Sequence, residues 1–168
     1  MSSIVMGVDP GSRIAGFGVI QIVGSELRHL NHGVVALDAE MPFAERMTEL
    51  GKAFRELMLK YQPQEVVIEK IFLGKNADSA FKLGHARGVI MYEAGLAEAK
   101  VFEYATRVVK KSVTGNGGAE KTEVQAVLQA LLGLRTIQRV DASDALAMAC
   151  HHAFELKKRK LIEKAIQL

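Results

Sequence analysis

The chain has 168 residues, of which 49% are hydrophobic and 24% are charged, and its formal net charge is +3. No apolar run approaches the roughly 20 residues of a membrane helix, the N-terminus lacks the features of a secretory signal, and the single Cys150 cannot form an internal disulfide. These features argue against membrane, secreted and disulfide-stabilised proteins, and we expect a cytoplasmic location. We predict one domain over residues 1–156, followed by a basic tail, 157–168, either separate or extending the last helix.

The first three predicted elements are strands. Residues 4–8 form an apolar run that predicts a buried strand. Residues 15–23 and 26–37 flank the turn signal Gly24-Ser25 and are predicted to continue the sheet as an antiparallel pair. Asp9 stands where the first strand ends, before Pro10 and Gly11. Because Asp before Pro-Gly also suits a β-turn, a simple turn residue is the alternative interpretation of Asp9.

The middle of the chain alternates helices and strands. Pro42 opens a helix whose apolar residues recur at spacings of three and four as far as Tyr61. Glu65–Glu69 is short and apolar inside, which predicts a central strand. Asn76 is a suitable N-cap for a long helix that reaches about Ala99. Residues 101–104 then predict a fifth strand.

Three more helices are predicted after the fifth strand: 106–113, 120–132, and a last one from about Asp141 into the basic run at 157–160. This element order predicts an α/β fold with a five-stranded mixed sheet flanked by helices. A right-handed helical crossover allows the strand Glu65–Glu69 to lie parallel to the first strand. Asp9 and Glu69 would then emerge together at the carboxyl ends of neighbouring strands, where ligand sites of α/β sheets gather.

Two further aspartates stand in "VDASDALAMA", residues 140–149. Asp141 and Asp144 are three positions apart, so on a helix they share one face of its first turn. As an alternative, Asp141 is an N-cap and Asp144 merely complements the helix dipole. The chain has only five aspartates, and three of them border apolar segments in these two motifs, which favours a functional role.

Asp9, Glu69, Asp141 and Asp144 would together form a site with about four negative charges, and such carboxylates raise one another's pKa. Mg²⁺ relieves that repulsion, because it takes oxygen ligands and completes its shell with water and substrate phosphate. Two such ions activate a water and stabilise the leaving oxygen in phosphodiester cleavage. We therefore predict a site for two Mg²⁺ ions, or Mn²⁺ in their place, at these four acids.

Other catalytic classes find no support in the sequence. No CxxC or His–Cys cluster indicates a zinc site, and no motif indicates a Ser–His–Asp triad. His151 and His152 are adjacent, so on a helix they diverge, and we interpret them as ordinary helix residues.

Positive charge gathers in the middle of the chain. Residues 70–121 carry nine basic and five acidic side chains, a net charge of +4, whereas residues 1–69 have a net charge of −3. Lys75, Lys82 and Arg87 are candidate phosphate contacts along the predicted helix after Asn76, with an ordinary solvated helix face as the alternative. A basic surface beside an acidic site suggests a polyanionic partner.

Phe72 follows the strand Glu65–Glu69 in a predicted loop. An exposed apolar ring beside basic residues can wedge into or stack on an unpaired base step. The alternative is a loop anchor folded onto the core, and the sequence alone does not favour either. Gly84 and Gly88 are spaced four apart on the predicted helix, which indicates close packing within the core or at a dimer interface.

Four segments in this order resemble the RuvC family of bacterial Holliday-junction resolvases: "GVDPGSRIAGFGVI", "VVIEKIFLGKNADSAFKLGHARG", "VFEYATRVVKKSVTGNGGAEK" and "VDASDALAMA". The resemblance covers the chain to about residue 155. It implies a ribonuclease-H-like fold and a Mg²⁺- or Mn²⁺-dependent endonuclease that cuts four-way DNA junctions by paired symmetric nicks in recombination and repair. It also implies a homodimer, 5′-phosphate ends, and partnership with the RuvA–RuvB branch-migration complex.

The resemblance assigns roles to individual residues. The family's catalytic acids fall on the four carboxylates already identified. Its functionally important lysines fall on Lys110 and Lys121, which are expected to assist catalysis and bind DNA, and its junction-centre aromatic falls on Phe72. Lys70 departs from the family, which commonly has glutamine at this position.

Two other functions remain open. "GVDPGSRIAGFGV" also resembles the phosphate-binding loop of actin-like ATPases, but the chain lacks the second domain and second phosphate loop of those enzymes. A junction-binding module without catalysis is the other alternative. Inactive relatives usually lose carboxylates, whereas all four are present here.

Overall fold

The computed structural model describes residues 2–70 and 76–166. Its strands and helices in chain order are β1 (Ser2–Asp9), β2 (Ile14–Val23), β3 (Glu26–Ala36), α1 (Phe43–Tyr61), β4 (Glu65–Glu69), α2 (Ala77–Leu96), β5 (Lys100–Tyr104), α3 (Thr106–Thr114), α4 (Lys121–Leu132) and α5 (Val140–Ile166). Every strand and helix expected from the sequence is present. No helix in these described ranges is long and apolar enough to cross a bilayer.

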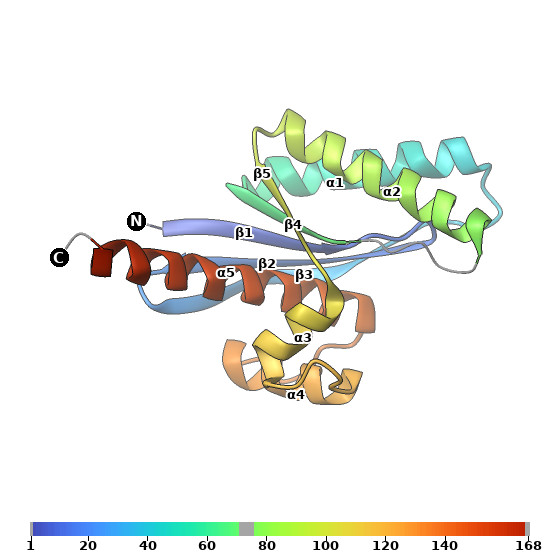
Figure 1. Ribbon diagram of the computed structural model, residues 1–168. Helices are drawn as coiled ribbons and strands as arrows, with labels where there is room; N and C mark the ends of the chain where they lie inside the picture. Colours follow the sequence, from blue (N-terminus) through green and yellow to red (C-terminus); the bar gives the residue numbers. More distant parts are fainter. Residues whose placement is uncertain (1, 71–75, 167–168) are drawn as a thin grey trace.

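The strands form one mixed sheet in the order β3-β2-β1-β4-β5 (Figure 1). β1 pairs antiparallel with β2 and parallel with β4, and β4 pairs parallel with β5. The predicted five-stranded mixed sheet and the parallel placement of the first and fourth strands are therefore confirmed. In the β1–β4 register Val8 lies opposite Ile68, so the next residues, Asp9 and Glu69, end the two strands side by side.

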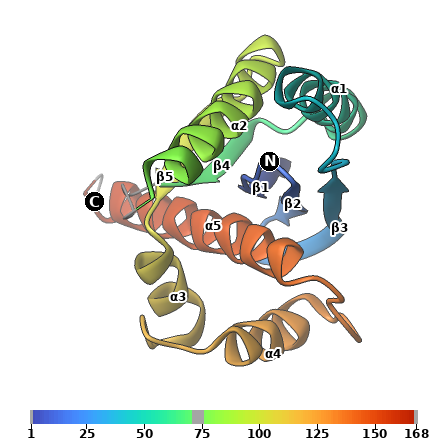
Figure 2. The ribbon, with the colours of Figure 1, turned by 90° about the vertical axis from the view of Figure 1, so that its right-hand side faces the viewer.

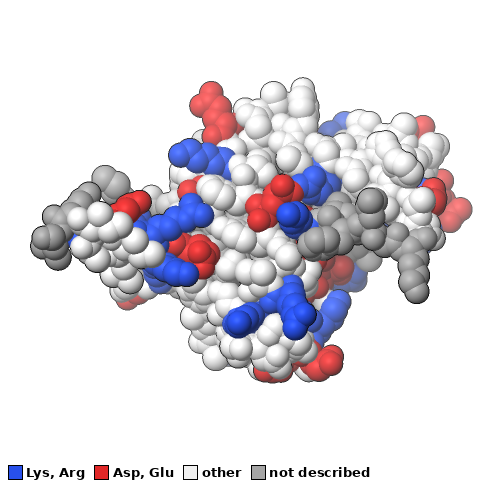
Figure 3. All heavy atoms as spheres, viewed as in Figure 1, with Lys and Arg blue, Asp and Glu red and all other residues white. Residues whose placement is uncertain are grey.

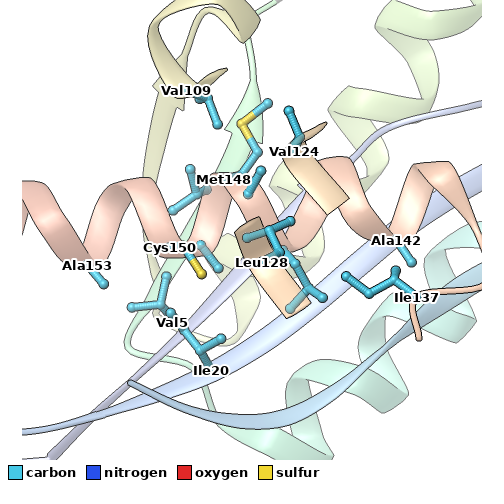
Figure 4. Packing of buried hydrophobic residues seen from close by; sticks show 14 of the residues in the cluster. Val5, Ile20, Val109, Val124, Leu128, Ile137, Ala142, Met148, Cys150 and Ala153 are labelled. Atoms are coloured by element: carbon cyan, nitrogen blue, oxygen red, sulfur yellow. The ribbon is translucent and has the colours of Figure 1, made fainter. Parts of the chain in front are cut away.

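The sheet separates two hydrophobic cores. Helices α1 and α2 cover one face, and α5 lies along the other, with α3 and α4 packed beyond it (Figures 1 and 2). Buried residues alternate between these cores along each strand: Val5 contacts the α5 side and Met6 the α1–α2 side. Figure 4 shows Met148 and Cys150 of α5 within the core on the α5 side of the sheet. The period-two alternation of strands thus determines which side chains meet α5.

Three glycines allow α5 to approach the sheet closely. A Cβ atom added to Gly7 would lie 1.9 Å from the Ala145 carbonyl oxygen, and one on Gly18 would lie 2.8 Å from the Leu146 Cα. A Cβ on Gly16 would lie 2.0 Å from the Asp141 carbonyl oxygen. No side chain fits at these distances, so glycine is required at these three positions of β1 and β2.

One helix boundary and one N-cap interpretation differ from the sequence analysis. α2 ends at Leu96 rather than near Ala99, since Glu98 adopts a left-handed φ of 57° that breaks the helix. α5 begins at Val140, so Asp141 lies inside the helix and the N-cap alternative for this residue is wrong. At its other end α5 continues without a break through the basic run to Ile166, and Lys157 Nζ donates a hydrogen bond to the Ser25 carbonyl at 2.6 Å.

His151 is 3% exposed, and neither of its ring nitrogens has a hydrogen-bond partner among the described residues. Burial lowers its pKa, against the opposing influence of Glu155. A histidine whose pKa is lower in the folded state stabilises the fold above its unfolded pKa near 6.5, and this contribution is lost as the pH falls.

We therefore expect His151→Leu to reduce the acid sensitivity of folding. Below pH 6.5 the free energy of unfolding of the parent should fall relative to the variant by up to about 1.4 kcal/mol per pH unit. Denaturant unfolding of both proteins between pH 7.5 and 5.5 measures this difference. Equal pH slopes would contradict it, and the paired comparison cancels the contributions of titrating groups that do not interact with His151.

Candidate active site

Asp9 and Glu69 lie at the same edge of the sheet and on the same face. Val5, Gly7 and Asp9 alternate toward α5 along β1, as Glu65, Val67 and Glu69 do along β4. The parallel register leaves the two carboxylates at neighbouring strand ends. Asp9 and Glu69 therefore lie close together, as predicted. The helical crossover makes β1 and β4 parallel neighbours, and the alternation along each strand places both side chains on the same face.

The first turns of α5 bring the other two acids to the same edge. Gly16 is the ladder partner of Asp9 on β2, and the α5 backbone at Asp141 crosses directly over Gly16. Asp144 lies one turn further along the helix. Glycine at position 16 thus allows the acidic end of α5 to reach the end of β1, a requirement that the sequence pattern did not reveal.

The electrostatics indicate that the four carboxyls share one site. Burial, together with the negative charges of Glu69, Asp144 and Asp141, raises the pKa of Asp9 to about 8, while Lys121 acts in the opposite direction. Burial likewise raises the pKa of Asp144, with Lys121 as the largest opposing influence. Carboxyls that disfavour one another's ionisation are close together and poorly compensated by the protein alone.

Lys121 and Lys110 approach this cluster in different ways. Lys121 is the first residue of α4, and its Nζ lies 3.7 Å from Asp144 Oδ2. Lys110 Nζ on α3 donates to the Ala119 carbonyl at 2.8 Å. Lys110 therefore ties α3 to the segment before α4 and holds the start of the helix that carries Lys121.

Glu69 has a partner that sequence reasoning missed. Thr106, the first residue of α3, donates a hydrogen bond from its Oγ1 to Glu69 Oε1. Tyr104 is the ladder partner of Glu69, and the Lys70 amide donates to the Tyr104 carbonyl at 2.9 Å. The end of β5 therefore fixes both the backbone and the carboxylate of Glu69. The only sign of this contact in the sequence is the position of Thr106, which begins a predicted helix directly after the end of a strand.

The remaining predicted residues are more dispersed. Lys82 is exposed, pairs with Asp78 at 2.6 Å, and lines a polar hollow with Ser12 and Arg13. Arg87 is half-buried and pairs with Glu103 of β5, so it joins α2 to the sheet. Phe72 and Lys75 lie outside the described residues.

The carboxylates suit a hard divalent cation by chemistry. They supply only oxygen ligands, and their mutual repulsion is the kind that a bound cation relieves. As the described side chains stand, no three His, Cys, Asp or Glu residues are arranged to hold an ion. The donor set fits a divalent metal, and adjustment of the carboxylate side chains is needed to close a shell around it.

Comparisons with known proteins agree on one family. Residues 5–152 match the family model described as crossover junction endodeoxyribonuclease RuvC. The chain is 67% identical over 168 residues, 100% of both chains, to the crossover junction endodeoxyribonuclease RuvC of Bdellovibrio bacteriovorus. It is 45% identical to that of Marinobacter nauticus over 151 residues, which cover 90% of this chain and 86% of the relative.

A solved structure agrees with the fold. The Thermus thermophilus RuvC in complex with a Holliday junction substrate superposes with a TM-score of 0.87 at 31% identity, covering 93% of this chain and 96% of the other. The ribonuclease-H-like fold expected from the sequence resemblance is thereby confirmed.

Proposed function

The chain belongs to the RuvC family of crossover junction endodeoxyribonucleases, and from this premise we propose that the cluster of four carboxylates is its nuclease site. The protein is a nuclease that resolves Holliday junctions. The observation that supports the location of the site is the raised pKa of Asp9 and of Asp144 at one edge of the sheet, to which burial contributes most and the neighbouring acids Glu69 and Asp141 contribute further. A bound cation would favour the ionised forms of these carboxyls.

In the proposed mechanism, Asp9, Glu69, Asp141 and Asp144 would hold the metal ions. Asp9, which lies between Glu69 and the first turns of α5, would be the ligand shared by both ions. Bound Mg²⁺ or Mn²⁺ supplies Lewis acidity to the attacking water and to the leaving oxygen. Lys121 neutralises negative charge that develops at the phosphate, and Lys110 holds the segment before Lys121 in place. The expected products carry 5′-phosphate and 3′-hydroxyl ends.

Lys121→Met should reduce the cleavage rate by about 10²- to 10³-fold, because it removes a cation placed beside the developing charge. Junction affinity should fall much less, since one phosphate contact among many is lost. Single-turnover cleavage and equilibrium binding of a labelled junction separate these effects.

Lys52→Met is a matched control, because Lys52 is exposed on α1 and pairs with Glu49 at 2.8 Å. It should leave the cleavage rate unchanged. A Lys121→Met variant that cuts at the parental rate would remove this lysine from the mechanism.

The proposed DNA surface surrounds this site. Figure 3 shows Lys and Arg side chains gathered over the region where Figure 1 places α3, and again along the C-terminal part of α5. We assign DNA contacts to Lys82, Lys110 and Lys121, and to Phe72, Lys75 and Arg87 as the sequence suggested, with Arg87 requiring release from Glu103. Such binding weakens steeply with salt, because phosphate contacts release counterions. A flat salt response would contradict a basic DNA surface.

A homodimer is part of the same proposal. The two-fold character of a four-way junction calls for two sites in a two-fold assembly. The outer side of α2 supplies an exposed apolar surface with Phe81 at 70%, Tyr92 at 63% and Leu96 at 58% exposure. Gly84 and Gly88 on this helix meet no neighbouring atom within 4 Å, so a second α2 can approach there. Sedimentation velocity at micromolar concentration tests for the dimer.

A cytoplasmic location and partnership with a RuvA–RuvB complex complete the proposal, and both are supported by membership of the family. The match to a nuclease family over residues 5–152 decides against an ATPase fragment. Incubation with a synthetic four-way junction, with and without Mg²⁺, tests the function directly. Paired symmetric nicks that require the ion are expected, and tight binding without ion-dependent cleavage would support the non-catalytic alternative instead.

A further inference from the structure

His152 of α5 forms a buried hydrogen-bonded link to two strands. Its side chain is 0% exposed. Its Nε2 lies 2.9 Å from Glu65 Oε2 at the start of β4, and its Nδ1 lies 2.8 Å from the Tyr104 hydroxyl at the end of β5. The ring also packs on Phe102, with centroids 4.3 Å apart. Both nitrogens of this buried imidazole are therefore satisfied, in contrast to those of its neighbour His151.

The partners determine the tautomer of His152. A carboxylate only accepts hydrogen bonds, so Nε2 carries the proton and donates to Glu65. Nδ1 is then the acceptor, and the Tyr104 hydroxyl donates to it. Burial lowers the pKa of His152, which keeps the ring in the neutral form that this arrangement requires. The link is directional, and leucine or phenylalanine at position 152 would leave two polar groups without partners.

The two hydrogen-bond partners of His152 lie on the strands that position Glu69. Glu65 belongs to β4, which contains Glu69, and Tyr104 belongs to β5, which pairs with it. Glu65 and Glu69 are the first and last residues of the five-residue strand β4. Tyr104 is the ladder partner of Glu69 and is followed two residues later by Thr106, which donates to the Glu69 carboxylate. His152 itself lies on the helix that carries Asp141 and Asp144. One side chain thus joins the two halves of the acidic cluster.

The rest of the α5 interface does not fix the position of the helix along the sheet in the same way. α5 presents mainly small residues, such as Ala145, Ala149 and Ala153, to β1 and β2. Packing between small residues and glycines is close but carries no directional bonds. In the described ranges, His152 makes all the side-chain hydrogen bonds between α5 and the strands β4 and β5.

We propose that His152 is a positioning residue, which through Glu65 and Tyr104 sets the place of α5 relative to β4 and β5 and hence the separation of Asp141 and Asp144 from Glu69. This role rests on the proposed carboxylate site. Loss of the link lets the two halves of the site drift apart and weakens ion binding without removing any ligand. Partners that orient metal ligands are typically worth 10- to 100-fold in metal affinity or activity.

The test compares four variants with the parent: His152→Leu, which removes both hydrogen bonds, Tyr104→Phe, which removes one, Ile90→Val, and Asp9→Asn. Ile90→Val makes a mild cavity at a fully buried position of α2, on the opposite face of the sheet. It controls for loss of stability alone. Mn²⁺ binding is measured by calorimetry without DNA, well below each melting temperature, and the Mg²⁺ concentration for half-maximal cleavage is measured separately.

We expect His152→Leu to weaken Mn²⁺ binding and raise the half-maximal Mg²⁺ concentration by about tenfold or more. Tyr104→Phe should shift both quantities in the same direction by less, and Ile90→Val should shift neither. Parental ion affinity in folded His152→Leu would overturn the proposal. If His152→Leu does not fold, parental ion affinity in Tyr104→Phe would overturn it. Parental Mn²⁺ affinity in Asp9→Asn would instead refute the carboxylate site itself, so the two failures are distinguishable.

Discussion

Asp9→Asn should reduce junction cleavage by on the order of 10³-fold or more, as removal of a member of a cooperating catalytic unit does. Asp9 ends β1 between Glu69 and the first turns of α5, and it is the carboxyl that all three other acids affect. Asparagine keeps the shape of the side chain but supplies no charge to hold a divalent ion. Single-turnover cleavage of a synthetic four-way junction measures the loss.

Folding and junction binding should survive this substitution. Asparagine removes one of several mutually repelling groups, so in the presence of a chelator the variant should melt no lower than the parent. Junction affinity should remain close to parental, because the basic residues that contact phosphates are intact.

Asp38→Asn is the matched control for Asp9→Asn, since Asp38 is exposed in the segment before α1. It makes the same chemical change away from the site and should cut at the parental rate. Full residual cleavage by Asp9→Asn, or loss of binding with cleavage retained, would contradict the assignment.

Gly16→Ala should impair both folding and cleavage, although glycine 16 carries no functional group. Its Cβ would lie 2.0 Å from the Asp141 carbonyl oxygen and 2.3 Å from the carbonyl carbon. These are backbone atoms, so α5 must move away from β2 at the turn that carries Asp141. Overpacking of this kind typically destabilises a fold by about 1–3 kcal/mol, and a displacement near 1 Å can lower a rate by about 10²-fold.

Two other glycines sharpen this test. Gly18→Ala contacts α5 at Leu146, beyond Asp144, so it should destabilise the fold with a smaller effect on cleavage. Gly95→Ala, in the last turn of α2, meets no atom within 4 Å and should stabilise the helix by up to about 1 kcal/mol. Denaturant unfolding and cleavage well below each melting temperature measure the three variants. A Gly16→Ala protein that cuts at the parental rate would show that α5 tolerates displacement.

The strand and helix pattern was predictable because local sequence carries it. Residues 4–8 form an apolar run that ends at Asp9, and residues 66–68 form one between Glu65 and Glu69. The helix between the third and fourth strands made a parallel return the expected connection. Asp9 and Glu69 could therefore be placed together before the structure was known. Asp141 and Asp144 could be placed on one helical turn, but nothing local indicated which end of the sheet that turn would reach.

The contacts that assemble the site were not predictable in the same way. Thr106 and Glu69 are separated by 37 residues, Tyr104 and His152 by 48, and Glu65 and His152 by 87. His152 was interpreted as an ordinary helix residue, and the structure instead gives it two buried partners. The hydrogen bond from the Lys110 ammonium group to the Ala119 carbonyl was likewise not indicated by the sequence.

The amino-acid sequence by itself determined the elements, the faces they bury and the acids at their ends, because periodicity and turn residues act over a few positions. Only the tertiary structure decided which faces meet and how closely. The approach of α5 to β1 and β2 depends on Gly7, Gly16 and Gly18, whose lack of side chains matters only once a helix lies over them. Periodicity specifies that a surface is buried, whereas the partner of that surface depends on the packing of the whole chain.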